Sequence, residues 1–99
     1  MSVMANDTRR FGADVASFRS GVTRLGASRN KLKSDMSVLQ NMWTGEAHEA
    51  LQSRFEADFE KLEDLVHHFE MLATSLEHAQ GEYETCENSV STIVDDLSV

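Results

Sequence analysis

Histidine and cysteine are the residue types in this sequence best suited to bind a metal or act as a nucleophile. His67 and His68 are adjacent, so on a helix they point to different sides, and His78 follows ten or eleven residues later. No His-Glu-X-X-His motif is present, and a di-iron site would need Glu-X-X-His on two helices. Cys86 has no histidine at helical spacing. We therefore predict no metal site, no cofactor and no catalytic residue, and hence no enzyme.

The elements that must carry these side chains are two long stretches in which apolar residues recur at alternating steps of four and three. Arg29 is the only charged position in the first seam, and Asp58 is the only one in the second. Sustained alternation of this kind predicts helices that pack side by side. The apolar seam residues include Phe11, Val15, Phe18, Val22, Leu25, Leu32 and Leu39 in the first stretch, and Phe55, Leu62, Leu65, Phe69, Leu72 and Leu76 in the second. Phe59 and Val66 are the adjacent apolar positions that widen the second seam.

The predicted fold is all-α, a single helix-turn-helix domain over residues 1–99. We place the first helix at about 8–40, the bend at 41–45 and the second helix at about 46–90, followed by a frayed C-terminal tail. Asn6 or Asp7 is expected to cap the first helix and Thr44 the second. Because the link is short, the helices should fold back as an antiparallel hairpin. Arg29 and Asp58 are expected either to form an ion pair or to extend their charged ends to the edge of the seam.

Dimerisation is predicted because the apolar stripe of the second helix is wider than one partner helix can cover. Phe59, Val66 and Ala73 lie beside the seam at seven-residue spacing. Two copies would form a four-helix bundle. Residues 1–42 carry seven Lys or Arg against three Asp or Glu, and residues 43–99 carry two against fourteen, so helices of different copies should attract. A homodimer is favoured, while a related but different partner chain would satisfy the same physics.

Composition excludes several other classes of protein. A net charge of −8 argues against nucleic-acid binding, which needs a basic face. No apolar run approaches the roughly 20 residues of a membrane-spanning helix. The first fifteen residues lack the apolar core of an ordinary secretory signal, which indicates either a cytosolic protein or export by a machine that reads another signal.

The stretch "NMWTGEA" places the only tryptophan of the chain, Trp43, in the predicted bend, two residues before Gly45. Trp43 could close the apolar end of the bundle, with Gly45 allowing a tight turn. It could also form a recognition surface for a partner, and the two roles are compatible.

A chain of about one hundred residues with two helical seams, "WTG" in the bend and "YETCE" in the second helix resembles the WXG family of small type VII (ESAT-like) secretion proteins. The resemblance implies a folded homodimer or heterodimer that a membrane ATPase complex exports without a cleaved signal peptide. It assigns Trp43 and Gly45 to the turn motif. It assigns Tyr83 and Glu87, four residues apart, to the family's Tyr-X-X-X-Asp/Glu export motif.

The function expected from this resemblance is that of a non-enzymatic secreted substrate or co-secretion partner, present in the cytoplasm before export. Trp43 of one copy and Tyr83 with Glu87 of the other are expected to form a composite surface for the export machine. The alternative is an intracellular helical adaptor or chaperone that targets a larger secreted protein.

Overall fold

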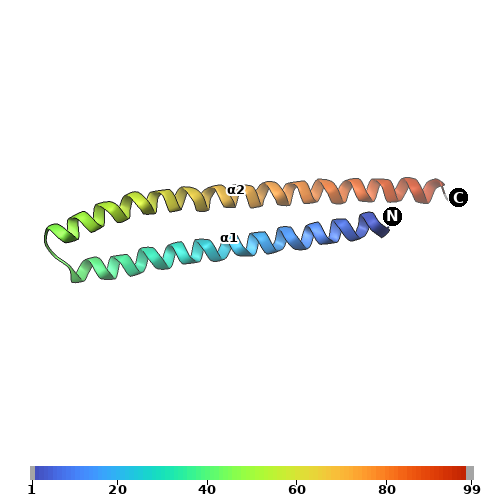
Figure 1. Cartoon of the computed structure of the whole chain (residues 1–99). Helices are drawn as coiled ribbons and strands as arrows, with labels where there is room; N and C mark the ends of the chain where they lie inside the picture. Colours follow the sequence, from blue (N-terminus) through green and yellow to red (C-terminus); the bar gives the residue numbers. More distant parts are fainter. Residues whose placement is uncertain (1, 98–99) are drawn as a thin grey trace. The chain divides into compact units, whose positions relative to one another are not determined.

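The computed structural model describes the backbone of residues 2–97 and the side chains of residues 6–97. Two helices, α1 (Ser2–Met42) and α2 (Glu46–Leu97), are joined by a link of residues 43–45 (Figure 1). The helices pack as an antiparallel hairpin, and no strand occurs within the described range. The predicted all-α hairpin is therefore confirmed. The hairpin is a single copy, so the predicted dimer bundle stays a prediction.

The first helix begins earlier than expected, at Ser2 rather than near residue 8. Asn6 and Asp7, the expected caps, lie inside α1, and the Asn6 side chain accepts a hydrogen bond from the guanidinium of Arg9. No glycine or proline interrupts residues 2–11, and Thr8, one heptad before Val15, is buried. The helical pattern therefore continues through the proposed cap.

The second helix begins at Glu46 and continues to Leu97, through the segment that was expected to fray after about residue 90. This segment contains β-branched threonines, which are weak helix formers when their hydroxyl groups compete with the backbone. Here the hydroxyls of Thr85 and Thr92 donate to the carbonyl groups of Gly81 and Asn88, each at 3.0 Å. These bonds run back one helical turn, so the threonines are accommodated without ending the helix.

The N-cap of α2 is Gly45 rather than the expected Thr44. Its carbonyl accepts the first helical hydrogen bond, from the Glu49 N–H at 3.2 Å. Gly45 has a φ of 98°, which a residue with a Cβ adopts only at a cost, so glycine is the residue that fits this position. Glu46 and Glu49 lie in the first turn of α2, where the positive end of the helix dipole favours carboxylates.

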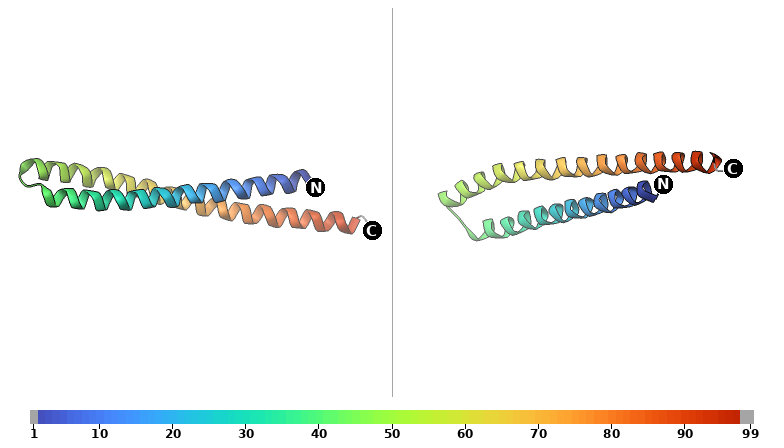
Figure 2. Two further views of the ribbon diagram at one scale, coloured as in Figure 1. Left: turned by 90° about the horizontal axis from the view of Figure 1, so that it is seen from below. Right: turned by 45° about the vertical axis from the view of Figure 1, so that its right-hand side comes forward.

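The chain divides into two compact units, the bend unit (Gly21–Glu70) and the terminal unit (Met1–Ser20 with Met71–Val99). In the bend unit, the buried side chains come from both helices: Val22 and Met36 from α1, and Phe59 and Val66 from α2. Figure 2 shows the two helical segments and their link from two further directions.

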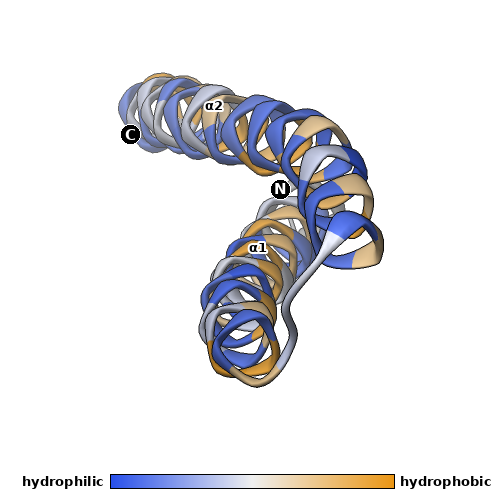
Figure 3. Ribbon diagram, turned by 90° about the vertical axis from the view of Figure 1, so that its left-hand side faces the viewer, coloured by the Kyte–Doolittle hydropathy of each residue, from blue (hydrophilic) through white to orange (hydrophobic). Residues whose placement is uncertain are grey.

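In the terminal unit the buried side chains also come from both helices, and they are smaller. Thr8 and Val15 of α1 and Ala73 of α2 are buried, while Phe11 and Leu76 are half-buried beside them. Ala73 is 0% exposed, so the backbones of α1 and α2 approach each other without a large side chain between them. Figure 3 shows hydrophobic and hydrophilic segments alternating along both helices, as amphipathic helices require.

The buried row of α2 side chains lies one position after part of the predicted seam. Phe59, Val66 and Ala73, seven residues apart, are buried, whereas Leu65 and Leu72 are 48% and 46% exposed. The row of Leu65 and Leu72 also contains Asp58. Burying an unpaired carboxylate is costly, so the helix turns this row outward and buries the adjacent apolar row.

Arg29 and Asp58 do not form an ion pair with each other. The carboxylate of Asp58 binds Arg54 on the same helix at 3.0 Å, and Arg29 donates to the amide oxygen of Asn30 at 3.3 Å. Arg29 is half-buried and Asp58 is exposed. Of the two expected alternatives the ion pair is wrong, and Asp58 is satisfied by a neighbour one helical turn away.

Candidate functional site

The link between the helices presents Trp43 on the surface of the bend unit. Its side chain is 45% exposed, and its backbone N–H donates to the Gln40 carbonyl at 3.4 Å. The positive φ of Gly45 then sets the direction in which α2 starts. An indole that is roughly half covered has apolar area for packing and a free edge for a partner. The geometry accommodates both roles expected of Trp43.

Tyr83 lies in the terminal unit and contacts an aromatic residue of the other helix. Its ring centroid is 6.1 Å from that of Phe11, with an angle of 58° between the ring planes. This is the tilted arrangement that aromatic pairs prefer. Tyr83 remains 41% exposed, and Glu87, one turn further along α2, is half-buried. Both members of the Tyr-X-X-X-Glu motif therefore belong to the helix pair and not to an extended tail.

The two parts of the expected composite surface lie in different units of the chain. Trp43 and Gly45 belong to the bend unit, and Tyr83 and Glu87 belong to the terminal unit. A surface that combines Trp43 with Tyr83 of a second copy stays a prediction.

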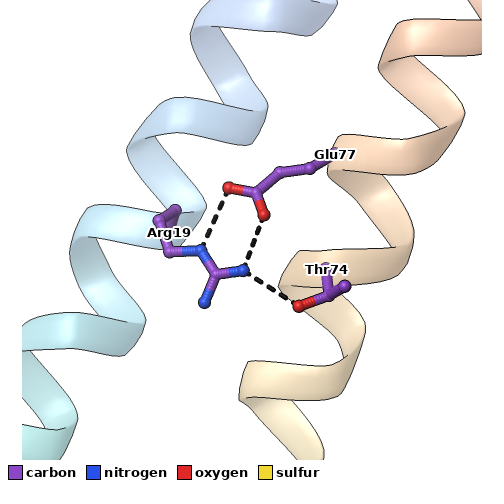
Figure 4. A network of polar contacts seen from close by, with 3 residues as sticks. All are labelled: Arg19, Thr74 and Glu77. Carbon is purple, nitrogen blue, oxygen red and sulfur yellow. Dashed lines mark hydrogen bonds and ion pairs between the residues drawn. The ribbon is translucent and has the colours of Figure 1, made fainter.

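Arg19 makes a polar contact between the helices of the terminal unit. Its guanidinium donates to both carboxylate oxygens of Glu77, at 2.6 and 3.0 Å, and to the Thr74 hydroxyl at 3.1 Å (Figure 4). The hydrogen bonds from Arg19 hold the pKa of Glu77 below its ordinary value of 4.5. A two-point contact of this kind favours one orientation of α1 on α2 here.

Sequence reasoning did not identify an acidic row along α2. Glutamates recur at seven-residue spacing, and all are exposed: Glu49, Glu56, Glu63, Glu70, Glu77 and Glu84. The signal is present in the sequence as a second heptad repeat, which apolar periodicity does not show. Arg19 uses one member of this row, Glu77.

Apolar side chains remain exposed on both units. In the bend unit, Leu32 and Leu39 of α1 and Leu65 of α2 are exposed beside half-buried Leu25 and Leu62. All five lie in the predicted seams. In the terminal unit, Leu72, Ile93 and Val94 of α2 are exposed. Single exposed apolar residues are normal, whereas several at heptad spacing provide apolar area that a further helix would bury.

The other predicted seam residues, and the adjacent Phe59 and Val66, are buried or half-buried in their units. In the bend unit, Val22, Phe59 and Val66 are buried and Phe55 and Phe69 are half-buried; in the terminal unit, Val15 is buried and Phe11, Phe18 and Leu76 are half-buried. Phe55 and Phe59 stack with ring centroids 5.3 Å apart.

The histidines and the cysteine do not converge on one place. His78 binds Glu82 on the next turn of α2 at 3.1 Å, and Cys86 is exposed. Within the described part of the chain, no three histidine, cysteine or acidic side chains are grouped as metal ligands would be. In residues 2–97, neither helix has the length and apolar content of a membrane span.

Comparison with known proteins gives the class of this hairpin. The family model described as "WXG100: Proteins of 100 residues with WXG" matches residues 7–88, which cover most of both helices and include Trp43, Gly45, Tyr83 and Glu87. The chain therefore belongs to the WXG100 family and is a small protein associated with type VII secretion. Members of this family are typically dimeric and generally non-enzymatic, and type VII systems secrete them. Searches of curated proteins and of solved structures gave no significant match.

Proposed function

We propose that this chain is a non-enzymatic substrate or co-secretion partner of a type VII secretion system, exported as a folded dimer. The membrane ATPase of that system reads the Tyr83–Glu87 motif, with Trp43 of the second copy as the other half of the recognition surface. Before export the dimer is held in the cytoplasm. The proposal is supported by family membership together with the helical context of both motifs.

The observation that supports a dimer is the set of exposed leucines on the bend unit, which come from both helices. Leu32 and Leu65 come from different helices and are each close to half exposed, although both lie in heptad patterns that favour helix packing. A second hairpin placed over these side chains would remove them from water. Burial contributes roughly 25 cal/mol for each Å² of apolar surface, so several leucines together favour association.

A second copy of the same chain is the proposed partner. α1 carries the excess of basic residues and α2 the excess of acidic ones, so the α1 of one copy is attracted to the α2 of the other. Each copy has a net charge of −8, and this repulsion opposes self-pairing. A less acidic WXG chain would avoid that repulsion, which keeps a heterodimer as the alternative outcome of the test.

Two measurements test this function. Light scattering of the purified chain should give the mass of two copies, and a monomer that forms a dimer only with a second WXG chain would replace the homodimer with a heterodimer. Export is measured in cells with a functional type VII system and in matched cells with an inactive membrane ATPase. The chain should reach the medium only in the first. Equal release from both strains would exclude the proposed route.

A further inference from the structure

The export motif is covered on one side by α1. Tyr83 is in contact with the ring of Phe11. Glu87, the acidic residue of the motif, is half-buried one turn further along the same face of α2. An i, i+4 pair on an isolated helix or a frayed tail would be open on all outer sides. Here the ring of Tyr83 lies next to the ring of Phe11, which is 72 residues away in the sequence.

One close approach and one polar contact also join the helices of the terminal unit near the motif. A Cβ on Gly12, the neighbour of Phe11, would lie 2.8 Å from the side-chain nitrogen of Gln80, so the Gln80 side chain of α2 lies against α1 at this level. Two turns further along α1, Arg19 binds Glu77 and Thr74. The contact of Phe11 with Tyr83 is therefore one of several between α1 and α2 in this unit.

We propose that Phe11 is a positioning residue of the export motif, so that the export machine recognises a two-helix surface made of Phe11, Tyr83 and Glu87. The inference rests on the proposed function, because it assumes that Tyr83 and Glu87 are read during export. The ring of Phe11 restricts Tyr83 to one orientation and adds apolar area beside it. The complementary partner is an apolar pocket that accepts the tyrosine edge, with a basic side chain placed to meet Glu87.

Rigid presentation explains how a short motif gains affinity. A tyrosine on a mobile segment loses rotamer freedom when it binds, whereas one held by Phe11 has lost that freedom on folding. An aromatic pair contributes an interaction that corresponds to about a two- to tenfold change in an equilibrium constant. Loss of the Phe11 ring should therefore reduce export by about that factor, even where the hairpin still forms.

The test compares export of the full chain with four variants in cells with an active type VII system. Phe11→Ala removes the contact and Phe11→Tyr restores a ring. Phe18→Ala is the matched control, because Phe18 is a half-buried phenylalanine of the same heptad row of α1, one heptad away in the terminal unit. Tyr83→Ala tests the motif itself. Circular dichroism and light scattering establish helicity and oligomeric state for each.

The proposal predicts that Phe11→Ala lowers export while Phe11→Tyr and Phe18→Ala keep it near the level of the unchanged chain. Equal export of Phe11→Ala and the unchanged chain overturns the proposal, and so does equal loss in Phe18→Ala, because that would show a general packing effect. Normal export of Tyr83→Ala contradicts the export motif itself, which separates failure of the proposed function from failure of the role of Phe11.

If Phe11→Ala loses its helicity, Phe11→Leu decides the question. Leucine keeps an apolar side chain against α2 but has no ring to stack on Tyr83. Reduced export of a helical, dimeric Phe11→Leu chain supports the proposal, and unchanged export overturns it. Loss of the dimer in Phe11→Leu would also overturn it, since the residue would then act on association with a second copy.

Discussion

Arg19 and Glu77 join the two helices of the terminal unit through a two-point ion pair, with nitrogen–oxygen distances of 2.6 and 3.0 Å. Glu77 has a pKa below its ordinary value of 4.5 because the Arg19 hydrogen bonds favour the carboxylate. A carboxyl group with a lowered pKa stabilises the folded state at pH values above its unfolded pKa. That stabilisation is lost as the pH falls through the folded pKa.

We therefore expect the melting temperature of the chain to fall as the pH is lowered below about 4.5, and Glu77→Gln to reduce this dependence. Thermal melting followed by circular dichroism from neutral to acid pH measures it. Glu84→Gln is the control, because the Glu84 carboxylate accepts a hydrogen bond from the neutral amide of Gln80 instead of a guanidinium. If both variants show the same acid response, the contribution of the Arg19 pair is refuted. The effect should be small, since both partners are partly exposed.

Val66 and Leu65 are adjacent in the sequence and should respond differently to the same truncation. Val66 is fully buried within the hairpin, so Val66→Ala should lower the free energy of unfolding by about 2 kcal/mol at any protein concentration. Leu65 is exposed, so Leu65→Ala should change the stability of a single hairpin by less than about 0.5 kcal/mol. It should instead weaken the dimer.

Denaturant unfolding at several protein concentrations, with sedimentation of the native samples, distinguishes these outcomes. A Leu65→Ala chain that remains as dimeric as the original would place the dimer contact elsewhere on the molecule.

Gly45 and Gly12 should respond to alanine with opposite signs. Gly45 has a φ of 98°, so Gly45→Ala should cost about 1–2 kcal/mol of stability. Gly12 lies inside α1, and the only close neighbour of a new Cβ is the flexible end of Gln80. Gly12→Ala should raise stability by up to about 1 kcal/mol, because alanine favours the helix and Gln80 can move aside. Melting temperatures of the two variants measure this difference, and a lower value for Gly12→Ala would show that Gln80 is held in place.

The packing role and the recognition role proposed for Trp43 can be separated by substitution. Trp43→Phe keeps an aromatic ring at the link, while Trp43→Ala removes it and should lower stability by about 1–2 kcal/mol, since the side chain is only partly covered. If the indole is recognised, export should fall by about tenfold or more in Trp43→Ala, as for an interface hot spot. Export assays and thermal melts are compared for both variants. Normal export with reduced stability would leave Trp43 a structural residue only.

The hairpin was predictable because helical periodicity is repeated many times in each half of the chain and no proline interrupts it. The ends of the helices were harder to predict. Gly45 is the N-cap of α2 because of its positive φ, which residue type alone does not reveal. Thr85 and Thr92 lie within the helix because their hydroxyl groups donate to carbonyl groups of the preceding turn.

The contacts of the candidate site were less accessible from the sequence than the motifs themselves. Trp43, Tyr83 and Glu87 stand out by residue type and spacing. The pairing of Phe11 with Tyr83 depends on the alignment of α1 against α2, which heptad patterns leave undetermined in steps of seven residues. The exposed position of Leu65 likewise depends on which of two adjacent apolar rows turns inward, and the charge of Asp58 was the available indication.

The acidic row of α2 has a consequence for misalignment. Because glutamates recur every seven residues, a hairpin slid by one heptad would again offer Arg19 a carboxylate, from Glu70 or Glu84. Such a slide displaces the helices by about 10 Å, which the link of residues 43–45 accommodates only if a turn of helix unwinds at the bend. The short link therefore selects one alignment of α1 against α2 among several that the charges alone would allow. Inserting flexible residues beside Gly45 should release the others as a mixture of shifted hairpins.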